Sequence, residues 1–182
     1  GVEVGPDGSF VPAHVFRCLT SIADVRIGSF TLGAFDSPGA FNAACTAGTT
    51  VFCDPGEANS VSASGGVISL MGSGSIQLNS STLAASAVPD TFGVFVQADM
   101  TAAPMMAPIG GNICVGGSVV RMNQIVFATG NEASLALDFS NSALVESIVG
   151  AGDTYYYQYF HRDTVFPGGG NFTNGVAITW AP

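Results

Sequence analysis

Lysine is absent from this sequence, and its four arginines stand far apart, at Arg17, Arg26, Arg121 and Arg162. Thirteen acidic residues oppose them, which gives a formal net charge of −9 at pH 7. Nucleic-acid binding requires a cluster of positive side chains, because phosphate contacts supply much of the affinity. The sequence therefore predicts no nucleic-acid partner. The lack of lysine also excludes Schiff-base and P-loop chemistry.

Charge of either sign is scarce, since charged residues make up 9% of the chain and hydrophobic residues 47%. An ordinary soluble protein carries about 25% charged residues. Exteriors with little charge are poorly protected from association. This composition favours a protein that assembles with copies of itself, a homo-oligomer or polymer. The alternative is a monomeric secreted sandwich coated with Gly, Ser and Thr.

Long apolar runs are also missing, and none reaches the ~18 residues that a helix needs to cross a bilayer. We therefore expect no membrane insertion. The chain begins at Gly1 without a methionine. We interpret it as a processed product or a fragment, from which a signal peptide has been removed.

Catalytic groups are few. His14 and His161 are the only histidines, and the Gly72-Ser73-Gly74 run lacks the spacing of a nucleophile elbow. A catalytic triad would need a nucleophile beside one of these histidines. The sequence predicts that the protein is not an enzyme.

The four cysteines, Cys18, Cys45, Cys53 and Cys114, include no C-x-x-C pair. An even number without metal-type spacing predicts two disulfides and an oxidising, extracellular or cell-surface location. Three connectivities are open. The alternative is four reduced thiols in a cytosolic protein.

Short apolar segments recur about every ten residues from residue 67 onward, separated by Gly, Ser, Pro and Asp turns. We expect strands at 67–70, 75–78, 82–88, 92–98, 112–120, 124–129 and 134–139. This rhythm predicts an all-β fold, an antiparallel β-sandwich of the Ig-like or jelly-roll-like kind. Residues 101–108 contain two prolines beside several methionines, so we expect a loop there, packed over the core or against a partner.

Residues 10–19 and 22–32 also have strand patterns, and the opening residues alternate apolar with polar side chains. An N-terminal strand segment can pair within its own chain or be added to the sheet of a neighbouring subunit. The candidates for an inter-subunit strand are Val2, Val4, Phe10, Val11, Val15 and Phe16.

An aromatic strand at 153–162 and a return strand at 176–180 predict a hairpin with a long Gly-rich loop. Both faces of the first strand carry apolar groups, so we expect it to be covered on both sides. Tyr155, Tyr157 and Tyr159 share one face. They are candidates for a glycan-binding surface, or for packing in a core or an interface.

Polar side chains gather after this strand. Asp163, Asn171 and Asn174 are hard oxygen ligands that could hold Ca²⁺. The alternative is that their side chains bond the loop backbone in Asx-turns. No other cofactor is expected.

Several of these segments together resemble a known module. The run at 151–154, the Phe160-His161-Arg162-Asp163 segment and the closing Asn-Phe-Thr-Asn-Gly at 171–175 are joined by the Gly-rich segment 110–117, Arg121 and residues 52–55 and 59–60. They are similar to an uncharacterised secreted all-β module of planctomycete and other environmental bacterial surface proteins. Asn174 stands where that module more often has Asp.

The resemblance covers residues 49–182 and implies a disulfide-linked extracellular domain without known activity. It favours pairing Cys53 with Cys114, which leaves Cys18 with Cys45. It also divides the chain into a segment of residues 1–48 and a sandwich module of residues 49–182.

These observations predict a structural subunit of an extracellular filament, pilus-like appendage or surface layer, joined by strand addition. The alternative function is a secreted carbohydrate-binding or adhesion module.

Overall fold

The computed structural model describes residues 3–4, 10–11, 48–76, 81–107, 110–139, 149–165 and 168–181. The described residues form strands and no helix. The strands are β1 (Glu3–Val4), β2 (Phe10–Val11), β3 (Gly48–Phe52), β4 (Val67–Gly72), β5 (Ser81–Ser86), β6 (Phe92–Ala98), β7 (Met100–Met106), β8 (Asn112–Gly116), β9 (Val120–Phe127), β10 (Glu132–Leu137), β11 (Thr154–Arg162), β12 (Gly170–Phe172) and β13 (Gly175–Thr179).

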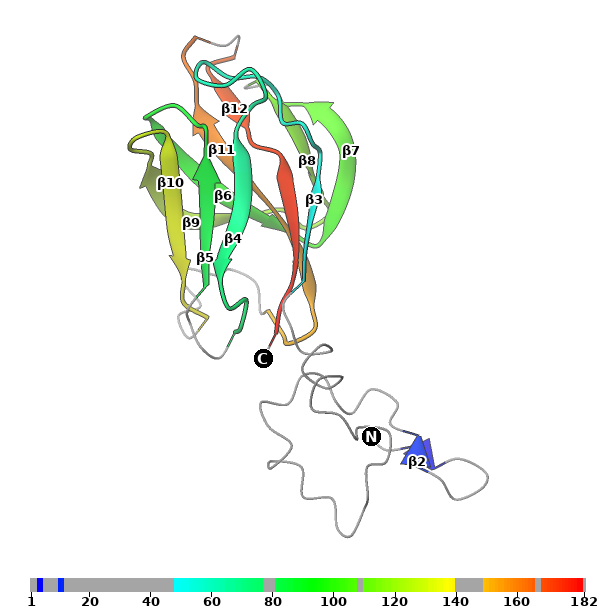
Figure 1. The fold of residues 1–182 in the computed structure, drawn as a ribbon. Helices are drawn as coiled ribbons and strands as arrows, with labels where there is room; N and C mark the ends of the chain where they lie inside the picture. The colour runs from blue at the N-terminus through cyan, green and yellow to red at the C-terminus, as the bar shows by residue number, and fades with distance from the viewer. Residues whose placement is uncertain are drawn as a thin grey trace.

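Two antiparallel sheets face each other across the main core (Figure 1). The smaller sheet has the strand order β10-β5-β4, and the larger has the order β3-β13-β11-β6-β9, with β12 paired to β11. The predicted all-β, antiparallel sandwich is confirmed. The predicted C-terminal hairpin is confirmed too, because β11 pairs with β13. The short strand β12 adds to it within the connecting segment.

The side chains of the core follow the two-residue period of a strand. In β10, Ala133, Leu135 and Leu137 are buried, and the residues between them are exposed. They pack with side chains of the larger sheet that include Phe95, Tyr157 and Ile178. Each large apolar side chain buried in this way stabilises the fold by about 1.5–3 kcal/mol.

The strands β7 and β8 form a separate two-stranded sheet against the outer face of the larger sheet. Val115 of β8 packs there on Val96 and Ala98 of β6 in a second, smaller core. Phe95 of β6 faces the main core. Because the β7–β8 pair covers its second face, β6 is buried along nearly its whole length, which is why its sequence is apolar except for Gln97.

Most of the strand predictions hold, and the segment 92–98 matches β6 residue for residue. The prediction of a loop at residues 101–108 was wrong, because residues 101–106 lie within β7. Pro104 is tolerated because β7 is an edge strand and its register with β8 shifts between Thr101 and Met105. Of the predicted strand 75–78, residues 75 and 76 are described, and Ser75 makes an isolated bridge with Ala181.

In the N-terminal segment, β1 and β2 pair with each other, through Glu3 with Val11 and Val4 with Phe10. The local pairing is the intramolecular alternative for these residues. Val2, Val15, Phe16, His14, Cys18 and Cys45 lie outside the described residues, as do the predicted strand 22–32 and most of 10–19. Strand addition to a neighbouring subunit stays a prediction.

Candidate functional site

The outer face of the larger sheet carries the polar and exposed groups of most interest. The disulfide Cys53–Cys114 lies there and joins the residue after β3 to the middle of β8, with 6.2 Å between the two Cα atoms. It confirms the pairing that the resemblance implied, and Cys114 is fully buried. The bond therefore fastens the β7–β8 pair to the larger sheet.

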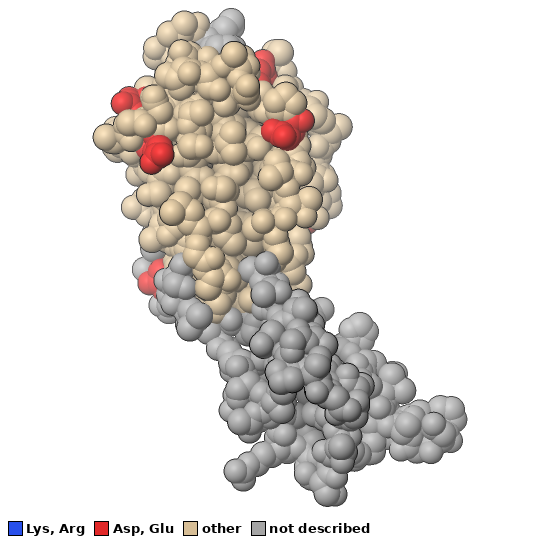
Figure 2. Space-filling view, in the orientation of Figure 1, with Lys and Arg blue, Asp and Glu red and all other residues tan. Residues whose placement is uncertain are grey.

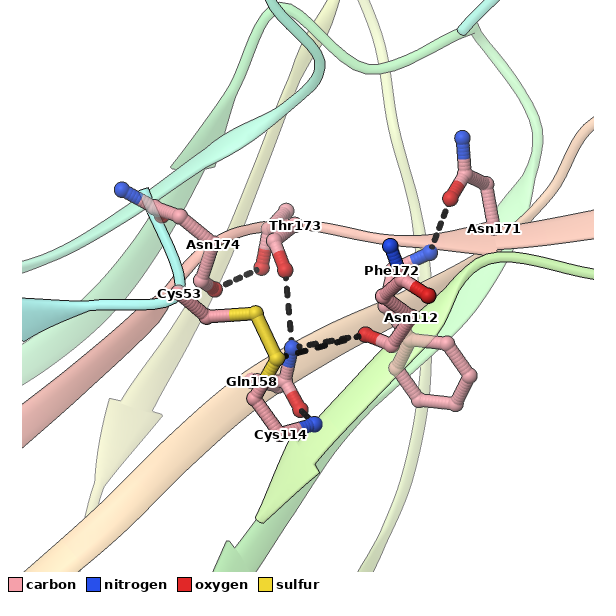
Figure 3. The surroundings of a disulfide bond; sticks show 8 residues. All are labelled: Cys53, Asn112, Cys114, Gln158, Asn171, Phe172, Thr173 and Asn174. Carbon is pink, nitrogen blue, oxygen red and sulfur yellow. Dashed lines mark hydrogen bonds between the residues drawn. A yellow bond between two sulfur atoms is a disulfide. The ribbon is translucent and has the colours of Figure 1, made fainter. Parts of the chain in front are cut away.

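Gln158 of β11 reinforces this attachment from beneath (Figure 3). Its Oε1 accepts a hydrogen bond of 2.7 Å from the backbone N–H of Cys114. Its Nε2 donates to the backbone oxygens of Asn112, at 3.2 Å, and Thr173, at 2.9 Å. A buried amide is costly unless its polar atoms are paired. Gln158 thus ties β8 to β11 and to the turn before β13.

The side-chain oxygens of the three candidate metal ligands already accept hydrogen bonds from backbone N–H groups. Asp163 accepts from Ser60 at 2.7 Å, and Asn174 accepts from Ile68 at 2.8 Å. Asn171 accepts from Phe172 and donates to the backbone oxygen of Ala58 at 2.7 Å. These bonds match the loop-bonding alternative. Among the described residues no group of three or more His, Cys, Asp and Glu side chains could hold a metal ion.

We expect excess EDTA to leave the melting temperature of the protein unchanged. The reason is that side-chain oxygens of Asp163, Asn171 and Asn174 accept hydrogen bonds from backbone N–H groups and are not arranged around a cation. Differential scanning calorimetry with and without chelator measures this. A melting temperature that falls in EDTA and recovers with added Ca²⁺ would show that the calcium prediction is right.

The tyrosines proposed as a glycan-binding face point into the main core. Tyr157 is 1% exposed and Tyr159 is fully buried, and Tyr155 packs partly buried against the same cluster. The Trp180 indole N–H donates to the Tyr157 hydroxyl at 3.1 Å, and the Tyr159 hydroxyl donates to the Val126 backbone oxygen at 3.3 Å. Burial raises the pKa of Tyr159 to about 12. The rings of Tyr157 and Tyr159 are closed to a sugar, so the packing alternative describes these two.

His161, the last member of that face, is also fully buried and stacks beside Tyr159. Burial lowers its pKa to about 4, although the backbone of Arg162 and the charge of Asp163 oppose the change. Since its ring has no exposed surface, it cannot reach a substrate in solvent. The prediction that the chain is not an enzyme stays a prediction.

The opposite face of β11 opens onto a groove of about 420 Å³. Strands β3, β7, β11 and β13 contribute its lining, which is Gly48, Thr49, Thr50, Phe52, Thr101, Thr154, Tyr156, Ala177 and Thr179. Sequence reasoning missed this site. The one signal was the alternation that places Thr154 and Tyr156 on the same face.

The β7 strand beside this groove is exposed for nearly its whole length. Met105 and Met106 are 64% and 72% exposed, and Met100 is 53% exposed. β7 pairs with β8 on one side, and its other edge bears no strand among the described residues. Packing over the core, the first alternative for these methionines, is therefore wrong for their side chains, and packing against a partner stays a prediction.

No family model, no curated protein and no solved structure matches this chain. No helix in the described part of the chain is long and apolar enough to cross a membrane.

Proposed function

We propose that this chain is a structural subunit of an extracellular filament, pilus-like appendage or surface layer, built by association of identical copies. The observation that carries the proposal is β7, an edge strand with exposed methionines and no charged residue. Proteins usually protect such an edge with charge or cover, because its free N–H and C=O groups are a template for another strand. β7 keeps only Pro104 and a register shift as interruptions.

The rest of the surface supports association. On the face drawn in Figure 2, acidic side chains are few and scattered, and most of the described surface is uncharged. The net charge of −9 opposes association of copies at low salt, and at physiological salt this repulsion is screened beyond about 8 Å. The association of copies then depends mainly on apolar contact and on backbone pairing.

The disulfide supports an extracellular location, because such bonds persist in oxidising compartments. The donor of the added strand is the N-terminal segment with Val4, Phe10 and Val11, and the acceptor is β7. An added strand gains backbone hydrogen bonds along the edge, and the exposed methionines adapt to its side chains.

We expect the double variant Met105→Lys/Met106→Lys to remain monomeric at concentrations where the wild type associates. Charges on an edge strand oppose pairing, since each must be desolvated when a strand is added. Multi-angle light scattering over a concentration series, with electron microscopy of the same samples, measures the effect. The double variant Val61→Lys/Val165→Lys is the matched control, because it adds the same charge at exposed apolar residues outside the strands.

Deletion of residues 1–20 tests the donor in the same assay, and we expect it to abolish association as well. A wild-type protein that is monomeric at every concentration would contradict the proposal. So would equal association of the β7 variant and the wild type.

A further inference from the structure

We propose that the groove on the outer face of the larger sheet binds a neutral saccharide. This goes beyond the proposed function, because the groove is lined mainly by β3, β11 and β13, whereas association is assigned to the free edge of β7 and its exposed methionines. Its volume of about 420 Å³ lies within the ~300–1,000 Å³ of small-molecule sites.

The register of three strands builds the floor of the groove. Thr154 of β11 lies opposite Thr179 of β13, and their hydroxyl oxygens are 2.8 Å apart. One step along the same face, Ala177 separates Tyr156 from Thr50. The small side chain of Ala177 leaves a depression between the threonines and the tyrosine.

The aromatic wall consists of Phe52 and Tyr156, whose rings meet edge to face with centroids 5.8 Å apart. Gly175 makes this arrangement fit, because a Cβ at that position would collide with the ring of Phe52. Tyr156 is half-buried and lines the groove. The wall is thus fixed by packing before any ligand arrives, which lowers the cost of ordering on binding.

The chemistry of this lining selects the ligand. The hydroxyls of Thr50, Thr154 and Thr179, which share a face with Tyr156, and the phenol of Tyr156 both donate and accept hydrogen bonds, as sugar hydroxyls require. The aromatic wall offers an apolar surface with a polar handle to the C–H face of a sugar ring. No lining residue is charged, so an acidic ligand would find no arginine or lysine partner. The protein's net charge of −9 also disfavours acidic glycans.

Nuclear magnetic resonance titration of the isotope-labelled protein tests the proposal with cellotriose, xylotriose, mannotriose and chitotriose as neutral probes. Trigalacturonic acid is the acidic comparison. We expect at least one neutral trisaccharide to shift the amide resonances of β3, the start of β11 and the end of β13, and the acidic probe to shift none of them. The Met105→Lys/Met106→Lys variant should bind equally well, which separates this proposal from the association of β7.

We expect Tyr156→Ala and the double variant Thr154→Val/Thr179→Val each to weaken binding by about tenfold or more, equivalent to ~1.4 kcal/mol. Tyr156→Phe keeps the packing against Phe52 and should weaken binding less. Ser69→Ala removes an exposed hydroxyl from the smaller sheet and is the matched control. Melting temperatures of all variants show whether the fold is retained.

The proposal is overturned if no neutral trisaccharide at millimolar concentration shifts these resonances. It is also overturned if folded Tyr156→Ala and threonine variants bind as tightly as the wild type, or if the acidic probe binds equally well.

Discussion

Replacing Cys53 and Cys114 together by alanine is expected to lower the free energy of unfolding by about 4 kcal/mol, because the bond closes a loop with a sequence separation of 61 residues. The bond limits the freedom of the unfolded chain, and in the folded state it holds β8 against the larger sheet. Denaturation in guanidinium chloride measures the difference. The paired substitution leaves no free thiol at either position, and the packing lost with the buried sulfur of Cys114 adds to the effect of the bond.

The location of the loss is as informative as its size. Hydrogen exchange should show the largest loss of protection in β7 and β8, since Gln158 and the small core around Val115 then hold them alone. Strands β5 and β10 in the smaller sheet serve as the internal reference. A loss of protection in β7 and β8 no larger than the loss in β5 and β10, which reports the lower global stability, would disagree with a fastening role, and so would a change in stability below about 1 kcal/mol.

Acidification from pH 6.5 to 4 is expected to cost about 3 kcal/mol of stability through His161 alone, because burial lowers its pKa from 6.5 to about 4. Above pH 6.5 the imidazole is neutral in both states, so the full stability is present. As the pH falls below 6.5 the unfolded chain binds the proton first, which favours unfolding. Below the folded pKa both states are protonated and the loss grows no further.

The comparison of wild type with His161→Phe isolates this effect, since the carboxylates and the second histidine are common to both proteins. Phenylalanine keeps a ring beside Tyr159 and cannot titrate. We expect a stability profile measured by urea denaturation to fall less steeply between pH 6.5 and 4 in the variant. Parallel profiles for the two proteins would show that His161 does not carry the dependence.

The sequence predicted the positions of most strands of the sandwich, and where one side of a strand faces solvent it also predicted which side is buried. In β10 the alternation of Ser134, Leu135 and Ala136 reports directly which side is buried. The turns also followed from local chemistry, since Gly and Pro act on their own neighbours. The loop prediction over β7 was wrong because Pro104 sits at an edge, where one missing donor is tolerated.

The candidate groove could not be predicted, for a physical reason visible in β11. Tyr156 and Phe160 on one face look as apolar as Tyr157 and Tyr159 on the other, so the sequence does not say which side enters the core. The groove further depends on the register that brings Thr50 and Thr179 beside Tyr156. That register joins segments distant in the sequence, and hydrophobic alternation alone does not specify it.

The attachment of β8 has a consequence for how this protein can change. The disulfide and the Gln158 amide hold β8 by its own backbone and sulfur, and neither uses a side chain of β7. The seven residues of β7 can accordingly be substituted without loss of the disulfide or of the Gln158 hydrogen bonds. The sequence of β7 can therefore change while β8 stays attached to the larger sheet. Such a strand is suited to acquiring new binding partners by substitution, or to displaying a peptide chosen in the laboratory.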